Sequence, residues 1–107
     1  MTTFDDRERA FEAKFAHDAE MQFKAEARRA KALGLWAGKE LGLNDNGVVL
    51  YAKRILQRSL EQPGIDHIVT QIEADLKMAG MTPMRSVAEM AQNFLAEAKA
   101  ELMPRED

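Results

Sequence analysis

The sequence contains no cysteine, which excludes a disulfide framework and any metal site built on thiolates. It also lacks an uninterrupted run of about 18 apolar residues, so no membrane-spanning helix is predicted. Residues 1–6 have neither the basic nor the apolar region of a secretion signal. These absences lead us to expect a cytoplasmic protein without direct membrane insertion.

Residue types that usually carry catalysis are scarce as well. There is no glycine-rich phosphate loop, and the only two histidines, His17 and His67, lie fifty positions apart. His17 stands close to Asp18 and Glu20, but scattered polar residues of this kind are common on helix surfaces and are a weak sign of a metal site. We therefore expect no enzyme activity, no metal and no required cofactor. A sharper hypothesis for His17 is that the protonation of its imidazole, at about pH 6.5, controls the docking of the N-terminal segment on a partner.

The charge balance is mildly acidic, with a formal net charge of −3 and a pI near 5.4. Proteins that bind nucleic acid or anionic membranes usually carry a basic surface, so neither is expected as the main partner. The length of 107 residues allows one domain with, at most, a short tail.

The chain is organised around residues 4–43, which contain no proline. In the first half, Phe4, Phe11 and Phe15 stand among five acidic and three basic side chains of residues 4–18, a local net charge of −2. At about 100° per residue the three rings fall within roughly 40° of one another on a helix. The second half is rich in alanine and leucine and is apolar over much of its circumference. The pattern predicts a charged helix with a narrow aromatic stripe, followed by a core helix.

One straight helix over residues 4–43 would be roughly 60 Å long at 1.5 Å per residue. A compact domain of 107 residues has a radius of gyration of only about 13 Å. The first half is therefore expected to project from the rest of the protein, to bend back onto it, or to stay disordered until it meets a partner.

Three further amphipathic helices are predicted from apolar residues at helical spacing. The second is expected from about Val48 to Glu61, and the third from Ile65 or Asp66 to Ala79, with Gly80 ending it. Thr82 as N-cap and Pro83 at the first helical position predict the start of a fourth helix that reaches Leu102.

Short turns between these helices favour antiparallel neighbours, so we predict an all-α fold, a four-helix bundle with an N-terminal helical or disordered arm. The arm comprises residues 1–19 and the body comprises residues 20–107. Most methionines are expected to serve as adaptable core filler. These include Met78, Met81, Met84, Met90 and Met103.

The three phenylalanines of the arm stabilise an ordered arm only if a surface buries their rings. Their burial supplies about 5–9 kcal/mol, whereas fixing some fifteen backbone residues costs about 1–2 kcal/mol each before helical hydrogen bonds offset part of it. That surface is either the body of the same chain or a groove on a partner that receives a helix. Helix physics alone gives the two possibilities about even weight.

Specific stretches of the sequence resemble a known family. They are residues 1–18, then 23–29 and 34–37, with the Pro63-Gly64 turn after the second helix. The chain resembles the zeta subunit family, small inhibitors of the F-type ATP synthase in alphaproteobacteria. It departs from the family pattern at Ala30 and at Gln62, both outside the arm.

The resemblance implies an inhibitory subunit whose arm enters the catalytic head of the synthase and blocks rotation in the direction of ATP hydrolysis. The protein would then be a free monomer in the cytoplasm, or peripheral to the inner membrane through the synthase. The phenylalanines of the arm would be anchors and its charged residues would set the register. These partner-binding residues are Phe4, Asp5, Asp6, Arg7, Glu8, Arg9, Phe11, Glu12, Lys14 and Phe15.

The family is also associated with weak ADP or ATP binding on the body. The dense cationic cluster Arg28, Arg29 and Lys31, with Trp36 about two turns away, is the candidate nucleotide site. The simpler interpretation is a solvated basic face with Trp36 in the core. For the whole protein, the alternatives are a general helical scaffold or adaptor without a link to an ATPase, or a homodimer formed through the phenylalanine stripe.

Overall fold

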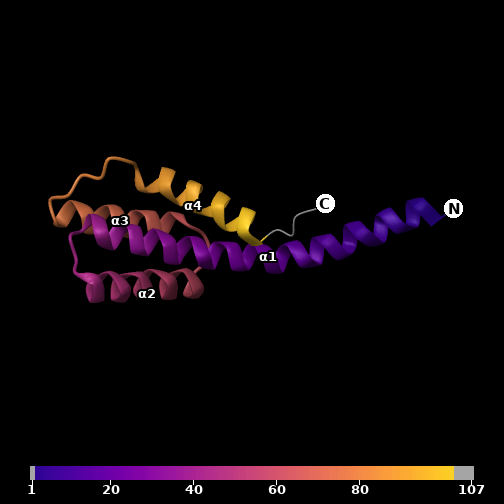
Figure 1. Ribbon diagram of the computed structural model, residues 1–107, viewed down its shortest axis with the longest axis horizontal. Coiled ribbons are helices and arrows are strands. Elements are labelled where there is room, and N and C mark those ends of the chain that lie inside the picture. Colours follow the sequence, from indigo (N-terminus) through magenta and orange to yellow (C-terminus); the bar gives the residue numbers. More distant parts are fainter. Residues whose placement is uncertain (1, 103–107) are drawn as a thin grey trace.

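A computed structural model describes the backbone of residues 2–102 and the side chains of residues 19–102. Its elements are α1 (Thr2–Glu40), α2 (Asp45–Glu61), α3 (Asp66–Met78) and α4 (Val87–Leu102). The backbone from residue 2 to residue 102 forms no strand. The prediction of an all-α four-helix bundle is therefore confirmed (Figure 1).

Helix α1 is one continuous rod of 39 residues. At 1.5 Å per residue it is about 58 Å long, and the molecule measures 64 × 28 × 23 Å. Figure 1 shows α2, α3 and α4 beside the second half of α1 only, while the first half extends past them. The radius of gyration is accordingly 17.4 Å, larger than the value of about 13 Å for a compact domain of this length. Of the three arrangements left open by the sequence, the structure has the projecting helix.

The turn after α1 has the hydrogen bonds of a Schellman motif. Gly42 adopts a positive φ of 79° and donates its N–H to the carbonyl of Lys39 at 3.0 Å, while the N–H of Leu43 reaches the carbonyl of Gly38 at 3.2 Å. The side chain of Asn44 then accepts the N–H of Gly47 at 2.7 Å and caps α2. Because of this cap, α2 begins at Asp45, one turn earlier than the sequence predicted.

Two glycines let α1 and α2 approach closely. A Cβ atom on Gly34 would lie 2.7 Å from the Cα atom of Ala52, and one on Gly38 would lie 3.1 Å from the Cα atom of Val48. Gly38 is thus a packing residue inside α1. Figure 1 shows α2 running alongside the second half of α1.

The core lies between the second half of α1 and the other three helices. The apolar stripes predicted for α2, α3 and α4 face it, and the first buried residue of α4 is Val87. The buried members of this core are Ala30, Leu33, Ala37, Tyr51, Ile55, Ile68, Ile72, Leu76, Val87 and Ala91.

The predicted start of α4 is wrong. Gly80, with a φ of 70°, ends α3 as expected, but α4 begins only at Val87. The hydroxyl of Ser86 accepts the N–H of Glu89 at 3.1 Å and so supplies the N-cap. Thr82 and Pro83 instead belong to the connection between the helices. Thr82 and Ser86 are both residue types that favour the N-cap position. The one that caps α4 is Ser86, which directly precedes Val87, the first buried residue of the helix.

The methionine prediction is wrong for three residues. Met78, Met81 and Met84 have exposed fractions of 89%, 42% and 102%, because they lie at the end of α3 and in the connection after it. Met90 does pack against the core. Met103 lies outside the described residues.

Candidate functional site

The residues expected to bind a partner all fall on the projecting half of α1. Their backbone is helical from Thr2 onward, but their side chains, from Phe4 to Phe15, lie outside the part of the chain whose side chains are described. The same is true of His17. Their contacts therefore stay predictions, and what the structure supplies is the backbone that carries them away from the other helices (Figure 1).

The described part of α1 shows where packing begins. Lys24 pairs with Glu20 at 3.5 Å on the surface, and the ring of Phe23 is 61% exposed. Among the residues with described side chains, the first buried one is Ala25. Within residues 19–102, the buried hydrophobic residues extend from Ala25 to Ala98. The core of the described residues is therefore built without contribution from residues 19–24.

The four candidate nucleotide residues lie in different surroundings. The Arg28 guanidinium is ion-paired with the Glu101 carboxylate of α4 at 3.0 Å, and both side chains are more than half exposed. Lys31 lines a groove against α2, whereas Trp36 packs against the core. Arg29 turns to yet another side, toward α3 and α4. The structure does not bring the four together, and ADP or ATP binding stays a prediction.

Arg29 differs from its neighbours because it is buried, with an exposed fraction of 9%. Its Nε atom is enclosed and has no hydrogen-bond partner. Desolvation by burial lowers the pKa of Arg29, and the nearby Glu26 carboxylate raises it in part. The sequence contains a signal for this burial that grouping Arg29 with Arg28 concealed. Arg29 lies four residues after Ala25 and four before Leu33, on the buried stripe of α1.

A polar network ties α2 to α3. The Tyr51 hydroxyl donates to the Asp75 carboxylate at 2.7 Å, and the Gln71 amide donates to the other carboxylate oxygen at 2.9 Å. Burial, and then the hydrogen bond to Asp75, raise the pKa of Tyr51 far above its ordinary value. The two hydrogen bonds to Asp75 thus hold α2 and α3 in position relative to each other.

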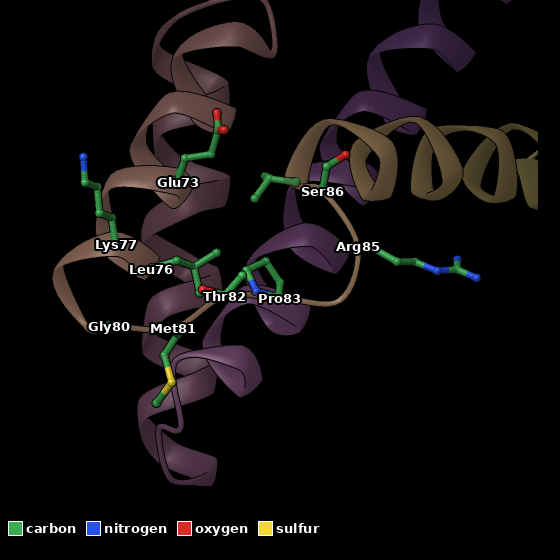
Figure 2. A pocket seen from close by; sticks show the side chains of 10 residues that line it. Glu73, Leu76, Lys77, Gly80, Met81, Thr82, Pro83, Arg85 and Ser86 are labelled. Atoms are coloured by element: carbon green, nitrogen blue, oxygen red, sulfur yellow. The ribbon is translucent and has the colours of Figure 1, made fainter.

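A cleft of about 550 Å³ lies at the end of the molecule away from the projecting helix, between α3 and the start of α4. Figure 2 shows Lys77 and Arg85 directed away from it on opposite sides. The Ser86 hydroxyl at its edge is already engaged as the cap of α4. Among the described residues, no three histidine or acidic side chains gather closely enough to hold a metal ion. Nor does any described helix combine the length and apolar character needed to cross a membrane.

Comparison with known proteins decides the family. The family model described as ATPase inhibitor subunit zeta matches residues 1–101. The chain belongs to the ATPase inhibitor subunit zeta family. No curated protein matches the sequence. The match includes the projecting half of α1 as well as the packed helices, so both parts belong to the family pattern. The resemblance found in the sequence is confirmed, and the family description is that of an inhibitor subunit of an ATPase.

Proposed function

We propose that this zeta-family chain is an inhibitory regulatory subunit of the F-type ATP synthase. Its arm, residues 1–19, inserts into the catalytic head and blocks the rotation driven by ATP hydrolysis, while its body, residues 20–107, stays outside. The observation that carries the proposal is that α1 continues as a helix beyond the other three helices in a chain of an ATPase inhibitor family.

The dimensions of the molecule support an arm that inserts and a body that stays outside. A single helix with its side chains is about 10–12 Å wide, whereas the molecule measures 28 × 23 Å across its long axis. A cleft that admits the arm therefore excludes the four-helix body. The body acts as a stop that fixes how far the arm enters, and the unbroken backbone of α1 transmits force between the two.

Within the cleft, the proposed anchors are Phe4, Phe11 and Phe15, since aromatic residues dominate the binding energy of most interfaces. The charged residues between them orient the arm as it approaches and oppose incorrect registers. With five acidic and three basic side chains in residues 4–18, the arm offers partners for both signs of charge. The protein is held at the inner membrane only through the synthase and is a monomer when free.

The test is inhibition of ATP hydrolysis by purified synthase. Phe11→Ala and Phe15→Ala are each expected to weaken inhibition by about 1–3 kcal/mol, or roughly 5- to 150-fold, because each removes one anchor. The matched control is Phe23→Ala, which removes an exposed ring of the same helix outside the arm. The proposal is wrong if Phe11→Ala and Phe15→Ala inhibit like the natural chain, or if Phe23→Ala is equally damaging.

The alternatives from other functional classes make different predictions. A homodimer formed through the phenylalanine stripe would sediment as a dimer and lose association in Phe11→Ala. A general scaffold or adaptor would leave ATP hydrolysis unchanged at every concentration. Sedimentation of the natural chain together with the hydrolysis assay distinguishes the three.

A further inference from the structure

The body contains a second cleft, of about 350 Å³, between α1, α3 and α4. Its walls are mainly apolar, with Val69 from α3 and Ala91 and Leu95 from α4. The polar side chains at the cleft are Arg29 from α1, Asp66 and Thr70 from α3, and Gln92 from α4. Its volume lies at the small end of the range for pockets that hold small organic molecules.

Arg29 is the residue of this cleft that its own chain leaves unsatisfied. The side chain is 91% buried, since only 9% is exposed, and its Nε–H has no acceptor. A buried N–H donor without an acceptor costs free energy, and an apolar residue of similar size can often replace a buried charge without loss of stability. The neighbouring Arg28, by contrast, has an acidic partner in Glu101 at 3.0 Å. An arginine whose Nε–H has no hydrogen-bond partner, at the wall of a mainly apolar cleft, is suited to an anion that comes from outside.

The residues that line the cleft indicate which class of anion fits it. An arginine presents parallel N–H groups that match a carboxylate, and the apolar walls match a hydrocarbon body. The carboxylate of Asp66 opposes further negative charge, so a polyphosphate is disfavoured at the same place. We propose that this cleft binds a small monocarboxylate with an apolar body, whose carboxylate pairs with Arg29. This role differs from the nucleotide contact expected of Arg29 from the sequence.

Binding would join three helices of the body. Helix α3 meets α1 and α4 along this cleft, so a ligand seated there contacts all three and stabilises the folded state by mass action. The site is on the body and uses no residue of the arm. Its occupancy is therefore measurable on the full-length chain without the synthase, and its failure would leave the proposed inhibitory function untouched.

Octanoate is the probe, and the full-length chain is the sample. Titration followed by calorimetry and by backbone amide NMR is expected to show saturable binding, with shifts at Arg29, Val69 and Ala91, and a melting temperature that rises with octanoate concentration. Octylamine, which carries the same tail and the opposite charge, is expected not to bind. Inorganic phosphate and ATP are expected to bind at this cleft more weakly than octanoate.

Three variants, one of them a control, test the roles of Arg29 and of the cleft. Arg29→Met keeps an unbranched apolar stem, removes the guanidinium, and is expected to fold while weakening octanoate binding by at least about tenfold. Arg28→Met, the matched control, is expected to bind like the natural chain. Should Arg29→Met fail to fold, Ala88→Phe provides a second test, because this exposed position lines the cleft and a ring there obstructs it. Any of three results would overturn the proposal. The first is the absence of saturable octanoate binding, and the second is octanoate binding that is unchanged in Ala88→Phe or in a folded Arg29→Met. The third is binding of ATP or phosphate at the cleft that is tighter than that of octanoate.

Discussion

The two halves of α1 share one backbone and differ in what surrounds them. In the second half a buried residue recurs every fourth position, through Ala25, Arg29, Leu33 and Ala37, and the other helices lie against it (Figure 1). The first half has its apolar rings at helical spacing too, yet α2, α3 and α4 lie beside the second half only. The comparison teaches that helical periodicity predicts an apolar face but not which molecule covers it. For the arm, we propose that the synthase covers it.

The largest effect is expected when a core residue of the second half is truncated. Leu33 has no exposed surface and lies in the middle of the core. Leu33→Ala should lower the free energy of unfolding by about 2–5 kcal/mol, through lost burial and the cavity left behind. Urea denaturation measures it. Phe11→Ala is the matched variant in the first half, and a loss of comparable size there would mean that the arm belongs to the core.

A smaller effect is expected where α1 touches α2. Gly34→Ala would place a methyl group 2.7 Å from the Cα atom of Ala52. Overpacking of this kind costs about 1–3 kcal/mol, which outweighs the gain of about 1 kcal/mol from replacing a glycine inside a helix. The expected net loss of stability in urea denaturation is about 1 kcal/mol. A more stable Gly34→Ala variant would show that the close contact between the two helices is absent in solution.

An effect of similar size is expected for the link between α2 and α3. Tyr51→Phe removes a hydrogen bond to Asp75 of 2.7 Å but leaves that carboxylate bonded to Gln71. The expected decrease in the free energy of unfolding is about 1 kcal/mol at neutral pH. Inhibition of ATP hydrolysis should not change, because the network lies in the body.

The pH dependence of the same variant has a definite sign. The pKa of Tyr51 is raised in the folded state. Its stabilising contribution is therefore complete below the unfolded-state pKa of about 10 and is lost as the pH rises above it. Tyr51 is the only tyrosine of the chain, so the natural protein should lose stability more steeply than Tyr51→Phe above about pH 10. Parallel pH profiles for the two proteins would contradict this assignment.

Much of the fold follows from local signals in the sequence. The buried faces of α2 and α3 are those that helical spacing predicts, and glycines at Gly42 and Gly80 end α1 and α3. The start of α4 was missed because Thr82-Pro83 and Ser86 are equally good local signals, and only the burial of Val87 against the other helices selects between them.

The candidate sites were harder to predict, for two reasons. The sequence groups Arg28, Arg29 and Lys31 by proximity along the chain, but consecutive residues of a helix point about 100° apart and meet different neighbours. Which neighbours they meet depends on how α3 and α4 pack, which is long-range information. The arm presents the opposite case, since its residues are evident in the sequence while its binding surface belongs to another molecule.

The most direct test of the central claim compares the full-length chain with one that lacks residues 1–18. Two quantities are measured on both proteins, the inhibition of ATP hydrolysis by purified synthase and the melting temperature of the free protein. Because the described core begins at Ala25, we expect the shortened chain to lose inhibition while its melting temperature changes little. A shortened chain that still inhibits, or one that melts far below the full-length protein, would contradict the separation of arm and body.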